Sequence, residues 1–155
     1  MNTLIKSIAA IAFMAGTLVA PAALAENAVA KAPLYERLGG LKGITVVVDD
    51  FIDRLLANKT LNANPAISAG RRALPAPYLK FQVSQMICEV TGGPCKYTGK
   101  GMKEAHAHLN ITEQEWGVMA TEFQKSLDRF NVPAAEQKEL FEIVGKTKSD
   151  IVSRE

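Results

Sequence analysis

The sequence predicts an all-α protein, and three observations favour this fold class. Apolar side chains recur every three or four residues over several segments, as they do on one face of a helix. Thr112 and Glu115 form the capping-box pattern that opens a helix. The strict apolar-polar alternation and the Asn-Gly turns of a β-protein are absent from the sequence. We therefore expect packed helices around one core, without internal repeats.

The first 25 residues are interpreted as a secretory signal peptide. Lys6 supplies a positive charge, residues 8–19 are apolar and uncharged, and Ala23-Leu24-Ala25 is a small-residue cleavage site. The apolar stretch is shorter than the roughly 20 residues that span a membrane, so an uncleaved anchor is the less favoured alternative. We expect an exported chain that begins near Glu26, periplasmic if the source is a Gram-negative bacterium.

The remaining chain of about 130 residues suits a single domain. Residues 26–33 are rich in alanine and are interpreted as a flexible leader before a domain spanning 34–155. The formal net charge of +2 falls by one when Lys6 is removed, and basic and acidic residues are mixed along the chain. This pattern predicts no nucleic-acid partner, and no membrane contact is expected after signal cleavage.

The first long helix is predicted from Leu41 to Leu56, because its helical period outweighs the strand preference of the β-branched run at 44–48. Residues 62–77 contain three prolines and show no sustained period. They are predicted to form a long connection with one helical turn inside. A helix over 77–90 follows, and Thr91-Gly92-Gly93-Pro94 ends it, because proline cannot continue a helix.

Three further helices are predicted in the C-terminal half of the chain. A short helix at 102–109 carries both histidines, and the capping box begins a longer one at 113–130. Pro133 suits the first turn of a last helix, whose apolar residues continue at helical spacing to Val152.

Cys88 and Cys95 are the two cysteines of the chain and lie seven residues apart. Cysteines of an exported protein are readily oxidised, and a Gly-Gly-Pro turn between these two could close the loop. We predict a disulfide that ties the end of one helix to the loop before the histidine-bearing helix. Two free thiols are the alternative.

His106 and His108 lie two residues apart, so on a helix their side chains project about 200° from one another. Regular helical geometry therefore prevents both from binding one metal ion. Three apolar neighbours place His106 on the buried side and leave His108 nearer to solvent; these are Met102, Ala105 and Leu109. Taken alone, a histidine on an apolar face is more often a hydrogen-bonded core residue than a metal ligand.

Five short segments stand out for their order and spacing. They are LYERLGG at 34–40, VVVDDF at 46–51, TGGP at 91–94, YTG at 97–99 and MKEAH at 102–106. Together they resemble the successive landmarks of the group 1 truncated haemoglobins over roughly residues 34–152. The resemblance implies a two-over-two helical sandwich around one haem b, with His106 as the proximal iron ligand.

The resemblance also implies which side chains line the haem pocket. They come from most of the predicted helices and are Phe51, Ile52, Leu79, Val83, Met86, Tyr97, Met102, Ile111 and Met119. Among them, Tyr97 could reach a haem propionate. For each residue taken alone, an ordinary core position is an equally good interpretation.

Two positions depart from the pattern of the family. Ile52 stands where many relatives have a tyrosine that hydrogen-bonds bound oxygen, and Asn64-Pro65 replaces a phenylalanine that clamps the haem. Leu79 and Val83 carry no hydrogen-bond donor either. The distal pocket is therefore predicted to be apolar, with oxygen, carbon monoxide and nitric oxide as the gas ligands and with weak retention of oxygen.

Three functions stay open from the sequence. The favoured one is a gas-binding haem protein whose iron is reduced by an unidentified reductant. The second is a periplasmic electron-transfer or haem-handling protein in which Met119 or Met86 supplies a sixth iron ligand. The third is a zinc-binding helical module that uses both cysteines and one histidine, although the spacing C-x6-C-x10-H fits none of the usual zinc patterns.

An enzyme is not predicted. The sequence contains no recognisable pair of nucleophile and base, no carboxylate pair and no phosphate-binding loop. Any turnover, such as nitric oxide oxidation or weak peroxidase activity, would belong to the haem. Covalent c-type attachment of that haem is excluded, because neither cysteine belongs to a CxxCH motif.

Overall fold

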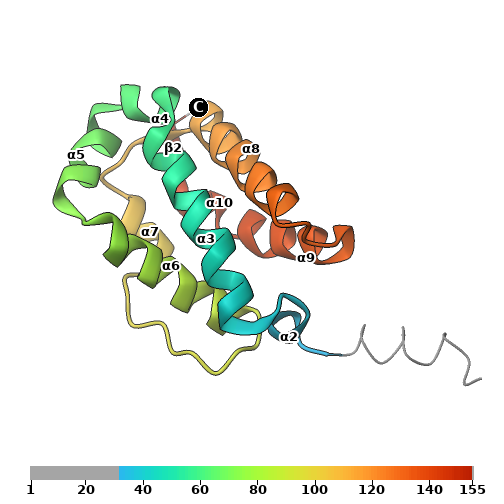
Figure 1. Ribbon diagram of the computed structural model, residues 1–155. Coiled ribbons are helices and arrows are strands. Elements are labelled where there is room, and N and C mark those ends of the chain that lie inside the picture. The colour runs from blue at the N-terminus through green and yellow to red at the C-terminus, as the bar shows by residue number, and fades with distance from the viewer. Residues whose placement is uncertain (1–31, 155) are drawn as a thin grey trace, which may run out of the picture. The chain divides into compact units, whose positions relative to one another are not determined.

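The computed structural model describes residues 32–154, and Figure 1 shows how their helices and strands are arranged. In chain order these are α2 (Leu34–Arg37), α3 (Gly40–Ala57), α4 (Lys59–Ala63), α5 (Pro65–Ala73), α6 (Ala76–Val90), α7 (Met102–His106), β1 (Ile111–Thr112), α8 (Glu113–Arg129), α9 (Ala134–Gly145), α10 (Lys148–Ile151) and β2 (Val152–Arg154). The predicted signal peptide and residues 26–31 of the predicted leader lie outside the described residues. Within the described part, no helix has the length and apolar character that crossing a membrane requires.

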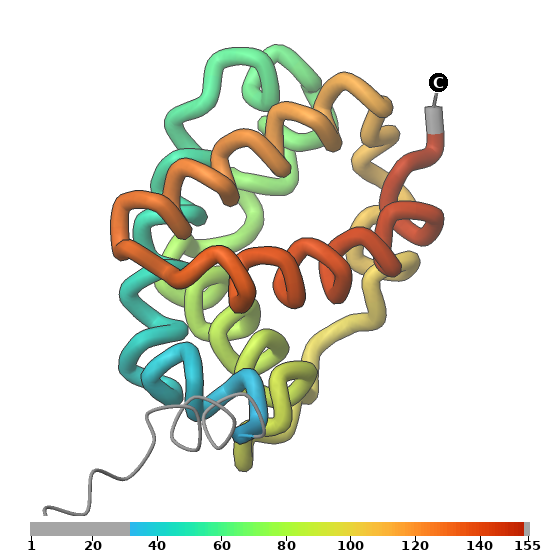
Figure 2. The backbone as a smooth tube through the Cα atoms, turned by 90° about the vertical axis from the view of Figure 1, so that its right-hand side faces the viewer, coloured from blue at the N-terminus to red at the C-terminus, as the bar shows by residue number. Residues whose placement is uncertain are grey.

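Two pairs of helices enclose the core, with α3 and α6 in one layer and α8 and α9 in the other (Figure 2). The ring centroid of Phe123 on α8 lies 5.1 Å from that of Phe51 on α3, so this contact joins the two layers. It also lies 5.2 Å from that of Phe141 on α9, within one layer. The buried apolar residues of this core are Leu34, Ile44, Val48, Ile52, Ile87, Cys88, Phe123, Leu127 and Leu140. The predicted all-α, two-over-two architecture is confirmed.

Local chemistry explains the longest helices. Ile44, Val48 and Ile52 are the buried residues of α3 and recur every four positions, so packing on the helical period overrides the strand preference of residues 44–48. The predicted capping box is present at the start of α8. Thr112 Oγ1 accepts a hydrogen bond from Glu115 N at 3.2 Å, and Glu115 Oε2 accepts one from Thr112 N at 2.8 Å.

The predicted long connection at 62–77 is wrong, because α5 occupies most of it. Asn58 and Asn64 cap α4 and α5, each accepting hydrogen bonds from two backbone N–H groups with its side-chain oxygen. Pro65 opens α5 instead of breaking a helix, since a proline in the first turn removes an N–H that has no helical partner. Prolines that suggested a loop therefore mark the starts of helices.

The last predicted helix is interrupted, which corrects its extension to Val152. Helix α9 ends at Gly145, and Thr147 donates hydrogen bonds from both its N–H and its hydroxyl to the Val144 carbonyl, which closes a turn. The chain then forms α10 and β2, and β2 pairs in parallel with β1. The histidine-bearing helix is also shorter than predicted, because residues 107–109 form a turn after His106.

Arg37 on α2 joins the start of the domain to α9 through hydrogen bonds. The Arg37 guanidinium donates from Nε to Ala32 O at 3.1 Å, from Nη1 to the Glu136 carboxylate at 2.7 Å and from Nη2 to the Glu139 carboxylate at 2.6 Å. These bonds fix α2 to α9, and the paired carboxylates hold the pKa of Arg37 above its usual value.

Candidate functional site

His106 is the last residue of α7, and its side chain is half-buried, whereas that of His108 is exposed. The predicted difference between the two histidines is confirmed. His106 Nδ1 lies 2.9 Å from the carbonyl oxygen of Met102. A carbonyl can only accept, so Nδ1 carries a proton, and in a neutral imidazole the lone pair then lies on Nε2. This is the tautomer that binds a metal through Nε2.

The half-buried apolar side chains predicted for the pocket come from several helices. Phe51 on α3 and Leu79, Val83 and Met86 on α6 are partly buried and pack against the core. Ile52 lies within the core itself, with 2% of its surface exposed. The other predicted apolar residues follow the disulfide loop: Met102 and Met119 are half-buried, and Ile111 is buried.

These residues fit a haem by the chemistry of their side chains. A single neutral imidazole with a free Nε2 is a suitable axial ligand for haem iron. Large apolar side chains that are only half-buried in the protein offer surface that a flat, apolar macrocycle could cover. Metal binding by a cluster of side chains has no comparable support, since no group of three or more His, Cys, Asp or Glu residues that could hold a metal occurs within residues 32–154.

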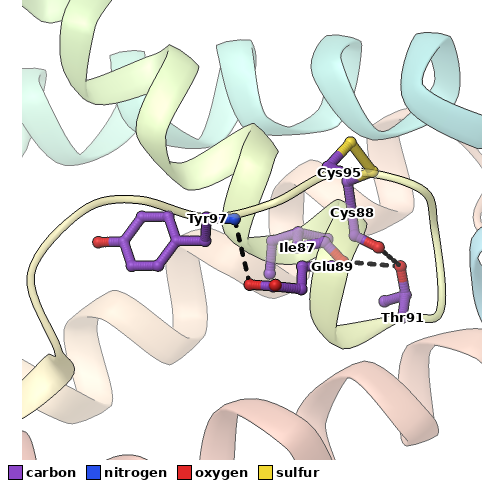
Figure 3. Close-up of a disulfide and its surroundings, with 6 residues drawn as sticks. All are labelled: Ile87, Cys88, Glu89, Thr91, Cys95 and Tyr97. Carbon is purple, nitrogen blue, oxygen red and sulfur yellow. Dashed lines mark hydrogen bonds between the residues drawn. A yellow bond between two sulfur atoms is a disulfide. The ribbon is translucent and has the colours of Figure 1, made fainter.

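Tyr97 lies in the loop between α6 and α7, and both its backbone N–H and its hydroxyl form hydrogen bonds with nearby residues. Its backbone N–H donates to Glu89 Oε2 at 3.2 Å (Figure 3), and its hydroxyl donates to Lys100 O at 2.8 Å. Burial, and to a lesser degree the nearby Tyr78, raise the pKa of the Tyr97 hydroxyl. The single hydroxyl proton is therefore already used, and a hydrogen bond from Tyr97 to a propionate would have to replace the one to Lys100.

The predicted disulfide between Cys88 and Cys95 is confirmed, and Figure 3 shows it joining the last turn of α6 to the loop that leads to α7. Gly93 makes this loop possible. A Cβ atom there would lie 2.5 Å from the Tyr35 ring and 2.7 Å from the Cys88 carbonyl oxygen, so only glycine fits. The bridge also uses both sulfur atoms that the zinc hypothesis required.

A small apolar cavity of about 40 Å³ lies between α3, α6, α8 and α9. Its lining includes Ile44, Val48, Phe123 and Leu127, all of which belong to the core. Neither His106 nor any residue predicted to line the haem pocket contributes to it. This cavity is thus a packing gap of the core, separate from the candidate site.

Sequence reasoning missed the polar contact that supports the segment after His106. Asn64 Nδ2 donates a hydrogen bond to Leu109 O at 3.0 Å. The sequence singled out Asn64 only as a departure from a family pattern. An Asn before a Pro signals a helix cap, but its second bond joins residues 45 positions apart and leaves no local pattern.

The chain belongs to the bacterial-like globins, whose family model matches residues 33–153. Among curated relatives, it is 28% identical over 124 residues to the group 1 truncated haemoglobin GlbN of Mycolicibacterium paratuberculosis, covering 80% of this chain and 87% of that protein. It is 22% identical over 121 residues to the group 1 truncated haemoglobin of Tetrahymena pyriformis, covering 78% and 95%. The resemblance drawn from the five sequence segments is confirmed.

Solved structures agree on the fold. The truncated haemoglobin of Tetrahymena pyriformis in its Fe(III) form matches with a TM-score of 0.68 at 22% identity, covering 77% of this chain and 97% of that one. The 2/2 haemoglobin of Synechococcus sp. PCC 7002, in the cyanomet state and with covalently attached haem, matches with a TM-score of 0.69 at 24% identity, covering 78% and 98%. Membership of the truncated globins implies a haem-binding globin.

Proposed function

We propose that this globin binds haem b through His106 and binds diatomic gases on the opposite side of the iron. The observation that carries the proposal is the hydrogen bond from His106 Nδ1 to Met102 O, which directs the ring and leaves Nε2 free. Bound haem would supply the iron that holds oxygen, carbon monoxide or nitric oxide.

The chain's own residues would orient and shield this group. The Met102 carbonyl would keep His106 in one tautomer and make Nε2 a stronger donor to the metal. The half-buried residues of α3 and α6, which are Phe51, Leu79, Val83 and Met86, would exclude water from the macrocycle. Met102, Ile111 and Met119 would add apolar contacts from the segments that follow the disulfide loop.

The direct test compares two variants in haem titrations followed by absorption spectroscopy. His106→Ala should bind haem weakly or not at all, whereas His108→Ala should bind it as the natural protein does, because the His108 side chain is exposed. A ferrous, gas-free spectrum of five-coordinate iron supports the proposal. An unchanged proximal signal in His106→Ala contradicts it, and a six-coordinate His/Met spectrum favours the electron-transfer alternative.

An apolar distal side should retain oxygen poorly. Iron-bound oxygen carries partial negative charge, and a hydrogen bond to a charged group contributes about 1.5–3 kcal/mol. Neither Leu79 nor Val83 can donate such a bond. Oxygen should therefore leave the natural protein roughly ten- to a hundredfold faster than it leaves Val83→Gln, with carbon monoxide much less affected.

Stopped-flow measurement of oxygen dissociation checks this prediction. Val83 suits the comparison because it is half-buried, whereas a tyrosine at the core position Ile52 would overpack its neighbours. Equal oxygen dissociation rates in the natural protein and Val83→Gln would contradict the apolar pocket.

Export from the cytoplasm is part of the same proposal. The N-terminal signal-peptide pattern supports it, and so does the Cys88–Cys95 disulfide, because disulfides persist in oxidising compartments. Mass spectrometry of the secreted or periplasmic protein should give a chain that begins near Glu26. A full-length chain retained in the cytoplasm would contradict export.

A further inference from the structure

Asn64 uses both ends of its side-chain amide. Its Oδ1 accepts hydrogen bonds from Ala66 N at 2.9 Å and from Ile67 N at 3.3 Å, which caps α5. Its Nδ2 donates to Leu109 O at 3.0 Å. One side chain thus begins a helix and also binds a segment on the far side of the disulfide loop.

Leu109 is coupled to His106 through the backbone. Its N–H donates to the His106 carbonyl at 2.9 Å, in the turn that follows α7. The Leu109 side chain also lies against α5, where its Cδ2 atom is 3.4 Å from the position that a Cβ on Gly70 would take. The cap residue of α5 therefore holds the turn after His106 by a hydrogen bond, and the Leu109 side chain lies over Gly70 of the same helix.

The C-terminal residues of the chain also contact the segments on both sides of this turn in the sequence, α7 and β1. Helix α10 packs against α7, β2 pairs with β1, and Lys148 forms an ion pair with Glu113 at 2.7 Å. Helix α7 has only five residues and none of them is buried. A helix this short is not stable alone, so the position of His106 depends on the segments that hold its ends.

We propose that Asn64 is a positioning residue for the iron ligand, acting through the carbonyl of Leu109. This inference rests on the proposed function, in which His106 Nε2 binds the iron. The bond from Asn64 limits how far the turn can move from α5, and the turn carries the C-terminal end of α7. Without that bond, His106 would hold its position relative to the haem less firmly.

Asn64→Asp separates the two tasks of this side chain. A carboxylate caps a helix as well as an amide does and is favoured at a helix N-terminus, so α5 keeps its start. The variant has no N–H to give to Leu109 O and places two acceptors against each other. The link to the turn is therefore lost while the cap is kept.

Asn58→Asp is the matched control. Asn58 caps α4 in the same way, accepting from Thr60 N at 3.0 Å and Leu61 N at 3.2 Å, and its Nδ2 donates to Glu122 Oε1 at 3.2 Å. This variant also keeps a cap and loses one donated bond, and it adds repulsion from the Glu122 carboxylate. The partner of Asn58, Glu122, lies on α8. If these substitutions act only by loosening the whole protein, the effect of Asn58→Asp should be at least as large as that of Asn64→Asp.

The experiment uses the haem-loaded mature protein and two readouts. Resonance Raman spectra of the ferrous, gas-free protein should show the iron–histidine band at lower frequency and broader in Asn64→Asp, and unmoved in Asn58→Asp. Haem transfer to excess apomyoglobin should be roughly three- to tenfold faster in Asn64→Asp, as expected for one lost hydrogen bond, and unchanged in Asn58→Asp.

Three outcomes would overturn these conclusions, and they are distinguishable. Natural protein without any iron–histidine band would overturn the proposed function and this inference with it. A natural band that Asn64→Asp neither shifts nor broadens, with an unchanged rate of haem transfer, would overturn the positioning role alone. Equal shifts in Asn64→Asp and Asn58→Asp would do the same, because they would reflect general loosening.

Discussion

The two ends of this globin are built differently. At one end, α3 and α8 contain three and four buried residues respectively, and they contribute much of the core. At the other end, where His106 lies, the helices α5, α7 and α10 contain no buried residue within the described part of the chain. The first end is stabilised by apolar packing, and the second by helix caps and single polar contacts.

Polar contacts differ between the ends as well. Asp50 on α3 accepts hydrogen bonds from Arg54 at 2.6 Å and from Ser126 at 2.8 Å and also pairs with Arg129, so it joins α3 to α8 inside a network. Asn64 makes one isolated bond to the turn after His106. The comparison teaches that core residues such as Phe123 and Leu127 are buried by the protein alone, whereas half-buried side chains such as Met102 have apolar surface that a cofactor could bury.

Leu127→Ala should give the largest loss of stability. The Leu127 side chain is fully buried on α8, and truncating such a residue costs about 2–5 kcal/mol of unfolding free energy because a cavity remains. Leu109→Ala, at the half-buried His106 end, should cost less in stability while accelerating haem loss. Urea unfolding monitored by circular dichroism measures both, and an equal cost for the two variants would contradict the difference between the ends.

Removal of the disulfide should have an intermediate effect. Cleaving a bridge that closes so short a loop costs about 2 kcal/mol, chiefly through the unfolded chain. Thermal unfolding with and without a phosphine reductant gives the value for the natural protein. The double variant Cys88→Ala with Cys95→Ser serves as the control, because it should unfold at the same temperature in both conditions. A natural protein that does not respond to reductant would show that the bridge does not stabilise the fold.

The smallest expected effect concerns how the free energy of unfolding falls at low pH. Burial alone would raise the pKa of Asp50, but hydrogen bonds from Arg54 and Ser126 outweigh it and hold the pKa below its ordinary value of 3.8. The charged carboxylate therefore stabilises the fold above that ordinary value, and its contribution is lost as the pH falls through the lowered pKa.

Asp50→Asn should consequently flatten the loss of stability below about pH 4. Urea midpoints measured from pH 7 down to pH 3 in both proteins decide this. Parallel curves would mean that Asp50 is not a coupling point between α3 and α8.

The sequence predicted those parts of the fold that have long helical periods. Helices α3, α6 and α8 carry apolar residues over four or five turns, and the capping box at Thr112 marks the start of α8. Helix α5 was missed because its apolar pattern is short and Pro65 was interpreted as part of a loop. The β1–β2 pairing was missed because strands of two and three residues have no period to detect.

For the candidate site, the sequence distinguished His106 from His108 and predicted the disulfide. Both predictions depend on neighbours within one helix or one loop. The bonds of Tyr97 to Lys100 and of Asn64 to Leu109 could not be predicted, because they depend on how the loop and α5 lie in space. Pocket-lining side chains and the site of haem attachment stay predictions.

The most direct test is hydrogen exchange with and without haem, measured by mass spectrometry. It shows whether haem bound through His106 stabilises the helices at the His106 end. Added haem should slow amide exchange strongly in α5, α7, the turn at 107–109 and α10. The C-terminal half of α8 should change little, because Phe123 and Leu127 are already buried there. In His106→Ala the same addition should leave exchange in α7 and its turn unchanged. Equal protection of α7 in His106→Ala, or no protection by haem in the natural protein, would contradict the account.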